Sequence, residues 1–343
     1  MFLGRRAVAQ AALAGRFWAT RNPASYSTEE ATGSAQGRWL SSETESSVMN
    51  VLPQEKQAAI IAAICEGVSI RATARLHDVH KNTILRLGLK VGEGCTALHG
   101  KLMKNLNVSR IELDEVWSFV KKKRRNVDAE DPDTVGDQFI YLAMDSTGKA
   151  ILTWLVGKRN ARNTMRFLED LRHRVVGSPD FNTDGYQPYQ RAVDLIFDTS
   201  AHGVVDKQMV VIAGGPESAN YYAKETLVKV ERIPIKGTPD TISTSFIERQ
   251  NLTLRMSQRR LTRLSNGFSK KYENHCAAVA LYATHYNFCR VHETLRLTPA
   301  MQLGVTDHVW TISELVTASM GGEVQERVQR EKSRFQVIQG GKA

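Results

Sequence analysis

An acidic residue interrupts an apolar stretch of the chain, IELDEVWSFV, at residues 111–120. Apolar and aromatic residues fill this stretch and predict a β-strand, but Asp114 stands near its middle. A carboxylate on a half-buried strand costs free energy unless another group compensates its charge. A basic cluster, residues 121–125, follows at once, so we expect the strand to end beside cations. The alternative interpretation is that Asp114 and Glu115 form a charge pair on an edge strand.

The composition narrows the class of partner. The 343 residues carry a formal net charge of +10, which favours a polyanion, although a basic surface can also lack any partner. The four cysteines form no CxxC pair, and the histidines and cysteines between His275 and His292 fit no closed tetrahedral zinc site. The longest apolar run, residues 58–65, is far shorter than the roughly 20 residues that cross a membrane, so no membrane protein is predicted.

The first 48 residues differ in character from the rest. The beginning of this segment is rich in arginine and poor in acidic residues, and the remainder is rich in Ser, Thr and Gly. One interpretation is a mitochondrial transit peptide. The preferred interpretation is adventitious translation upstream of a natural start at Met49. Under either interpretation we expect this segment to be disordered or loosely attached.

Residues 49–95 have the pattern of a helix-turn-helix. Ser69 is suited to cap a second short helix, and Ile84, Leu87 and Val91 are spaced to face inward from a third. Two short helices, a tight turn and a third helix predict a reader of the DNA major groove, with an ordinary three-helix bundle as the alternative. The outward residues that would contact DNA at the start of the third helix are Lys81, Asn82, Thr83 and Arg86.

A linker and an α/β region follow. Gly92 and Gly94 are expected to loosen the chain before a connecting helix. Strand and helix patterns then alternate, with a hairpin around residues 146–148 and a later strand that ends at Asp184. Residues 198–240 are harder to interpret: QMVVIA and LVKVERIPI predict strands, whereas HGVVD predicts a loop.

Basic residues concentrate after Glu248. In this helical region Ile247, Leu254 and Leu261 recur every seven residues as a buried stripe. Arg255 is seven residues after Glu248 and projects from nearly the same helix face, where it could hold a DNA phosphate. The equally favoured alternative is a basic helix face that is only solvated. The candidates for DNA contact outside the helix-turn-helix are Lys121, Lys122, Lys123, Arg255, Arg259 and Arg260.

Three carboxylates are candidates for metal-dependent chemistry. Asp114, Asp184 and Glu248 fall on a strand, at the end of a later strand and on a helix, so only the folding of a sheet can bring them together. Clustered carboxylates raise one another's pKa, and divalent cations relieve the repulsion. Oxygen ligands suit Mg²⁺ or Mn²⁺, and two such ions about 3.5–4 Å apart can act on a phosphodiester.

Each acid also has a structural interpretation. Asp184 precedes Gly185, and this pair is common in turns. Glu248 stands three residues after Ser245, which is the spacing of a capping box. The acids that could replace a member of the trio are Glu112, Glu115 and Asp145.

Four motifs resemble those of DDE-type transposases of small bacterial insertion sequences: DEVWSFV with its basic run, TDGYQPY, FIERQNLTLRMSQRRLTRLSNGFSKK and YNFCRVHETLRLTPA. The resemblance covers residues 49–303 and implies a ribonuclease-H-like domain that acts on terminal inverted repeats. Carried over by motif, the metal-holding triad is Asp114, Asp184 and Glu248. The resemblance also implies that water first cuts a phosphodiester and the freed 3′-hydroxyl then attacks target DNA, without a nucleotide cofactor.

The sequence thus predicts an α/β fold with a ribonuclease-H-like mixed five-stranded sheet flanked by helices, preceded by an all-α helix-turn-helix domain. The predicted parts are an extension at 1–48, the helix-turn-helix at 49–95, a linker helix at 96–108, the catalytic domain at 109–305 and a tail at 306–343.

The leading functional hypothesis is a DNA transposase with two Mg²⁺ or Mn²⁺ ions that acts on element ends as a homodimer or a higher oligomer. We expect it in the bacterial cytoplasm, associated with the nucleoid, unless residues 1–48 are a genuine transit peptide. The alternatives are a captured, catalytically silent transposase that regulates by binding DNA, and a general ribonuclease H or nuclease.

Overall fold

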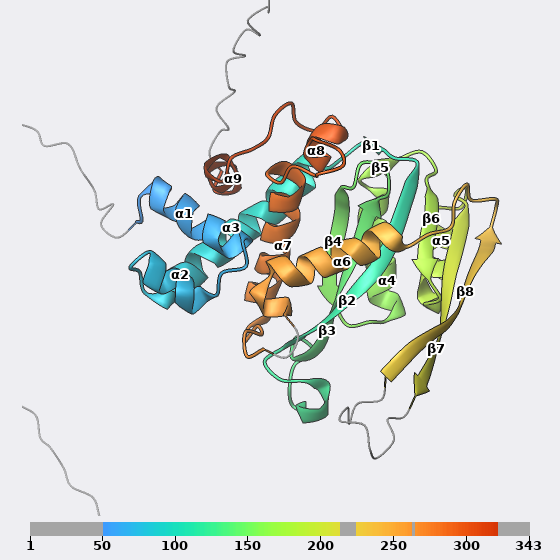
Figure 1. Ribbon diagram of the computed structural model, residues 1–343, viewed down its shortest axis with the longest axis horizontal. Helices are drawn as coiled ribbons and strands as arrows, with labels where there is room; N and C mark the ends of the chain where they lie inside the picture. The colour runs from blue at the N-terminus through green and yellow to red at the C-terminus, as the bar shows by residue number, and fades with distance from the viewer. Residues whose placement is uncertain (1–50, 213–223, 263–264, 322–343) are drawn as a thin grey trace, which may run out of the picture. The chain divides into compact units, whose positions relative to one another are not determined.

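The described part of the chain is a mixed sheet with helices on both faces and a group of helices at its side (Figure 1). A computed structural model of the protein describes residues 51–212, 224–262 and 265–321. The predicted extension at residues 1–48 therefore lies outside the described residues. None of the described helices is both long and apolar enough to cross a membrane.

The sheet has the strand order β4-β3-β2-β6-β7-β8. Its strands are β2 (Arg110–Val120), β3 (Gly136–Asp145), β4 (Ile151–Gly157), β6 (Asp180–Asp184), β7 (His202–Ile212) and β8 (Lys224–Lys236). β2 runs antiparallel to β3 and parallel to β6, and β7 runs parallel to β6. The strand that carries Asp114 is central, so the edge-strand interpretation is wrong. The hairpin predicted around residues 146–148 joins β3 to β4.

The predicted α/β fold of the ribonuclease-H-like class is confirmed, but the sheet has six strands in the described residues and not five. The additional strand is β8, which pairs antiparallel with β7. The predicted loop HGVVD is also wrong, because His202 begins β7 and pairs with Lys236 of β8. Pairing with β6 and β8 places this segment inside the sheet.

β3 is apolar along most of its length because helices cover both faces of the sheet. Tyr141 and Ala143 belong to a core that includes residues of α4 and α5, whereas Ile140 and Leu142 point the other way, into a core with α6 and α7. The predicted stripe of α6 lies in this second core. The covering helices are α4 (Ala161–Arg172), α5 (Gln187–Ile196), α6 (Ser245–Ser257) and α7 (Tyr272–Phe288).

The three helices predicted for the helix-turn-helix region are present as α1 (Gln54–Cys65), α2 (Ile70–Leu76) and α3 (Lys81–Leu102). The Ser69 hydroxyl accepts a hydrogen bond from the backbone N–H of Ala72, as expected for a cap. Ile84 and Val91 are fully buried on the inner face of α3. The residues predicted for DNA contact lie on the outer face at the start of α3.

The break predicted at Gly92 and Gly94 is wrong, because α3 continues through both glycines as one helix of 22 residues. A Cβ atom at Gly92 would lie 2.3 Å from the carbonyl oxygen of Ala277 in α7. A Cβ atom at Gly94 would lie 1.8 Å from the carbonyl oxygen of Ser319 in α9 (Ile312–Ser319). The glycines therefore allow close helix packing and do not interrupt the helix.

The tail predicted at 306–343 is packed against the rest of the chain over its first residues. Leu315 and Val316 of α9 are buried, and the Trp310 ring lies 4.8 Å from the Phe288 ring, centroid to centroid. Residues 322–343 lie outside the described residues. The remaining short elements are β1 (Leu106–Asn107), β5 (Val175–Val176), α8 (Pro299–Gln302) and the 3₁₀ turns Arg124–Asn126 and Arg259–Leu261.

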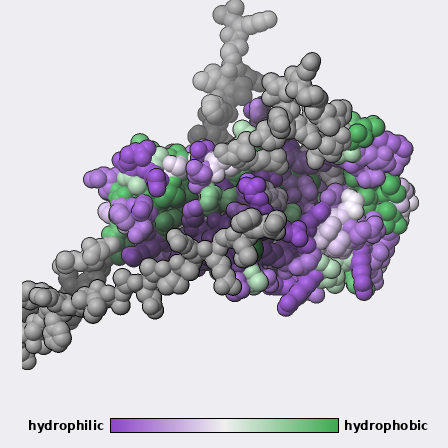
Figure 2. All heavy atoms as spheres, turned by 90° about the horizontal axis from the view of Figure 1, so that it is seen from below, coloured by the Kyte–Doolittle hydropathy of each residue, from purple (hydrophilic) through white to green (hydrophobic). Residues whose placement is uncertain are grey.

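The outer ends of β7 and β8 form a two-stranded ribbon with both faces open. The consecutive residues Met209 and Val210 are both about half exposed, as are Leu227 and Val228. Consecutive strand residues point to opposite faces, so the ribbon exposes apolar side chains on each. Figure 2 shows hydrophobic surface at this end, beside a largely hydrophilic middle.

We predict that Gly92→Ala and Gly94→Ala each lower the free energy of unfolding by about 1–3 kcal/mol, because the new methyl group overlaps backbone atoms. Gly88→Ala is the matched control in the same helix. A Cβ atom there meets only the Ile64 Cδ1 atom, at 3.9 Å, so stability should be unchanged or higher by about 0.5–1 kcal/mol. Thermal unfolding monitored by circular dichroism tests this, and equal melting temperatures for all three variants would contradict it.

Candidate active site

A cleft of about 700 Å³ opens where the central strands meet α6. Its lining includes Asp114 in the middle of β2, Asp184 at the end of β6 and Glu248 in the first turn of α6. The parallel pairing of β2 with β6 brings the first two acids together, and the packing of α6 on β2 brings the third. The three acids selected from the sequence therefore lie in one cleft.

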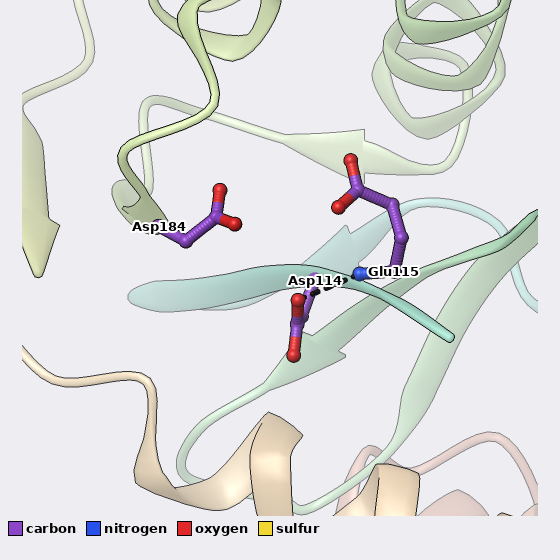
Figure 3. Close-up of side chains that lie close together, drawn as sticks. All are labelled: Asp114, Glu115 and Asp184. Atoms are coloured by element: carbon purple, nitrogen blue, oxygen red, sulfur yellow. Dashed lines mark hydrogen bonds between the residues drawn. The ribbon is translucent and has the colours of Figure 1, made fainter. Parts of the chain in front are cut away.

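The tightest group of acids contains Asp114, Glu115 and Asp184. One carboxylate oxygen of each lies within 4.8 Å of the others. Figure 3 shows Asp184 reaching from β6 toward β2, where Glu115 points to one side of the strand and Asp114 to the other, toward the helix. Glu115, considered from the sequence only as a replacement, thus joins the cluster. Carboxylate oxygens at this separation suit a hard divalent cation.

The electrostatic cost of this cluster appears in its pKa values. Burial raises the pKa of Asp114 to about 7, and the negative charges of Asp184 and Glu248 contribute to the rise. Burial also raises the pKa of Glu115 to about 7, against the opposing effect of the Arg159 guanidinium. Raised carboxyl pKa values at a cleft are typical of functional sites.

Neutral donors hold Asp114 in place. The backbone N–H of Glu115 donates to Asp114 Oδ1 at 2.8 Å, and the Asn251 side-chain amide donates to Oδ2 at 2.7 Å. Asn251 lies on α6 three residues after Glu248, so the same helix supplies both a candidate ligand and an orienting partner. The Thr244 hydroxyl donates to Glu248 Oε1 at 2.5 Å, whereas the expected capping box with Ser245 is not formed.

Two cations occupy the cleft among the acids. The Arg159 guanidinium lies 3.3 Å from Glu115 Oε2 and 3.4 Å from Asp184 Oδ2. The Lys207 ammonium forms an ion pair with Glu248 Oε1. Asp184 also accepts a hydrogen bond from the backbone N–H of Tyr186, so it stabilises a turn while its other oxygen faces Arg159.

Glu112 and Asp145, the other acids considered from the sequence, have structural roles. Glu112 Oε2 accepts hydrogen bonds from the backbone N–H groups of Phe246 and Ile247, both at 2.9 Å. Asp145 accepts from the backbone of the β3–β4 turn. Glu112 therefore fastens the start of α6 to β2, one residue before Glu248.

A protein-family model matches part of the chain. Residues 135–213 match a family model described as a DDE domain. The match runs from the start of β3 to the end of β7 and so includes Asp184. It confirms the predicted resemblance to DDE-type transposases. None of the curated proteins matches the chain.

Solved structures of transposases have a weak similarity to this chain. The crystal structure of the Mos1 strand transfer complex matches at 16% identity with a TM-score of 0.19, covering 47% of this chain and 60% of the Mos1 chain. The piggyBac transposase synaptic complex with hairpin DNA matches at 10% identity with a TM-score of 0.34, covering 82% and 73% respectively. These scores are low, so the fold and the cleft stand on the chain's own geometry.

The basic residues singled out in the sequence lie outside the cleft lining. Lys121 and Lys122 both form ion pairs with Asp131. Lys123 lies over the Phe119 ring. The other three candidates lie in the last turn of α6 or just after it. Arg255 approaches the carbonyl oxygen of Trp117 at 3.4 Å, Arg260 turns inward toward Ser269, and Arg259 is exposed.

The cations and the amide that contact the acids were missed by the sequence analysis. Arg159 follows β4 in a short connection, and Lys207 lies in β7, within the stretch that the sequence left unclear. No motif marks either residue. Asn251 was within the quoted third motif, and its spacing of three from Glu248 on a helix could have identified it as a neighbour on the same face.

We predict that Glu112→Ala lowers the free energy of unfolding by about 1–3 kcal/mol, because one buried and one partly buried N–H group lose their acceptor. The start of α6 should also become mobile, and amide hydrogen exchange at Phe246 and Ile247 should accelerate. Glu231→Ala, which removes an ion-paired acid on β8, is the control. Unchanged exchange at these two amides would contradict the role of Glu112.

The raised pKa of Asp114 predicts a pH dependence of stability in protein freed of metal by chelation. Between about pH 4 and pH 7 the folded state binds more protons at this carboxyl than the unfolded state, so stability falls as pH rises through this window. Asp114→Asn should flatten the profile by about 1 kcal/mol or more between pH 5 and pH 8. Urea unfolding at several pH values measures this, with Asp128→Asn on the surface as the control.

Proposed function

We propose that the chain is a metal-dependent DNA transposase with Asp114, Asp184 and Glu248 as its catalytic acids. The observation that carries the proposal is that these three residues, far apart in the sequence, line one cleft of a chain that matches a DDE-domain family model in part. Glu115 joins them as a further candidate ligand.

The donor set fits hard divalent cations such as Mg²⁺ or Mn²⁺. The cleft offers carboxylate oxygens, the ligands that these ions prefer, and mutual repulsion that a cation would relieve. Bound there, such ions would polarise a phosphodiester and activate the attacking oxygen. Whether one or two ions bind, and which metal is preferred, belongs to the proposal.

The chain's own residues would orient the ligands and the DNA. Asn251 holds one oxygen of Asp114, and Thr244 holds one oxygen of Glu248. Both carboxylates are therefore oriented before the substrate binds. Hydrolysis would break one phosphodiester bond and free a 3′-hydroxyl, which would then attack a phosphodiester of target DNA and expel a second 3′-hydroxyl.

Recognition of the element ends would fall to α2 and α3. Lys81, Asn82 and Arg86 at the start of α3 are exposed to solvent, and Thr83 is partly exposed. In a helix-turn-helix, polar side chains at the start of the recognition helix suit base edges and phosphates of a major groove. Because two ends must be joined, we propose that a homodimer or a higher oligomer acts on the DNA.

We predict that Asp114→Asn, Asp184→Asn and Glu248→Gln each reduce strand cleavage by roughly 10²–10⁴-fold, the equivalent of several kcal/mol in the barrier. The assay uses duplexes from the DNA that flanks the coding region, with Mg²⁺ or Mn²⁺, and measures cleavage and strand transfer. Asp128→Asn, an exposed acid outside the cleft, should retain full activity.

The outcomes separate the rival functions. Cleavage that survives loss of all three acids would refute the assignment. Specific DNA binding without any metal-dependent cleavage would point to a captured transposase that acts as a regulator. Cleavage of any RNA–DNA hybrid, without preference for the flanking DNA, would point to a general nuclease.

A further inference from the structure

We propose that Arg159 and Lys207 are exchangeable counter-ions of the cleft. They neutralise the acids when no divalent cation is bound, and they turn to the DNA phosphates when a divalent cation takes the acids. This inference rests on the proposed function and adds a coupling between metal binding and DNA binding.

The two cations occupy oxygens that a metal ion would need. Glu248 Oε1 receives both the Lys207 ammonium and the Thr244 hydroxyl, and Asp184 Oδ2 faces the Arg159 guanidinium. Asp114 differs, because its two oxygens accept hydrogen bonds only from neutral N–H groups among the described residues. Binding of a divalent ion across these acids therefore has to displace the two cations.

The Arg159–Asp184 and Lys207–Glu248 ion pairs are accessible enough to exchange, whereas the side chain of Glu115, which Arg159 also contacts, is 3% exposed. The side chains of Arg159, Lys207, Asp184 and Glu248 are 35%, 38%, 42% and 42% exposed. Ion pairs at such exposure contribute little to stability, so a divalent cation can replace them at little cost. The burial of Asp114, in contrast, keeps one ligand fixed throughout.

The displaced side chains would remain beside the substrate. Arg159 and Lys207 both belong to the lining of the cleft, and the Arg159 guanidinium lies 3.8 Å from the centre of the Tyr186 ring, which can support it after release. A guanidinium binds a phosphate through two parallel hydrogen bonds, and a lysine binds it as a point charge. A DNA strand that enters the cleft would thus meet two cations that the metal has set free.

This exchange makes metal and DNA binding mutually supportive. A metal ion frees two cations for DNA, and DNA that holds these cations removes competitors of the metal. Loss of either cation should therefore strengthen metal binding in the absence of DNA and weaken the effect of metal on DNA binding.

The first experiment measures Mn²⁺ binding by calorimetry without DNA, in the intact chain and in Lys207→Met and Arg159→Met. Removing one unit charge a few ångströms from a divalent ion in a solvated cleft should tighten Mn²⁺ binding roughly tenfold. Lys229→Met is the matched control, since Lys229 pairs with Glu231 on β8, outside the cleft. Lys207→Gln repeats the test with a polar side chain in case Met disturbs folding.

The second experiment measures binding of duplex DNA by fluorescence anisotropy with and without Mn²⁺. The gain in DNA affinity on adding Mn²⁺ should be largest in the intact chain and in Lys229→Met, and smaller in the two cleft variants. Mn²⁺ affinities in the cleft variants that equal the Lys229→Met value would overturn the exchange while leaving the proposed function standing. An intact chain that binds no Mn²⁺ would overturn both.

Discussion

The carboxylate of Glu112 joins the sheet to the helix that completes the site. It is fully buried on β2 and accepts hydrogen bonds from the first amides of α6. The first N–H groups of a helix have no partner within the helix, and a negative charge there also complements the helix dipole. Glu248 follows these amides directly. One buried contact therefore determines where the third acid stands relative to Asp114, two residues along β2 from Glu112.

Burying the acids of the site lowers the stability of the fold. β2 carries three carboxylates within four residues, Glu112, Asp114 and Glu115, and burial raises the pKa of each. A strand covered on both faces would be more stable with apolar residues at these positions. The packed cores on the two sides of β3 and the cations Arg159 and Lys207 offset this cost. Such electrostatic conflict is typical of a site arranged around a positive ligand.

A local pattern in the sequence predicted Asp114, whereas Asp184 and Glu248 became strong candidates through the resemblance of their motifs to those of transposases. An acid in an apolar strand, and the seven-residue repeat of Ile247, Leu254 and Leu261, depend on local geometry alone. The partners of the acids could not be predicted in this way. Arg159 and Lys207 reach Asp184 and Glu248 only through the pairing of β6 with β7 and the position of the connection after β4.

The glycines of α3 and the segment around α9 show the same limit of local reasoning. A glycine in a helical pattern usually weakens the helix, and the sequence therefore predicted a linker at Gly92 and Gly94. The structure uses the missing side chains for contact with Ala277 and Ser319, which are 185 and 225 positions further along the chain. The sequence assigned residues after 305 to a tail, yet Leu315 and Val316 are buried in α9, which packs against α1 and α3.

The continuity of α3 has a consequence for how the proposed reader and the cleft work together. A helix of 22 residues is about 33 Å long, close to one turn of B-DNA. Its first turn carries the exposed polar residues. In its middle, Gly92 and Gly94 pack directly against the backbones of α7 and α9. A flexible linker would let the reader and the cleft move independently. A single packed helix instead fixes their separation, so under the proposed function the position at which DNA is read would determine the position at which it is cut.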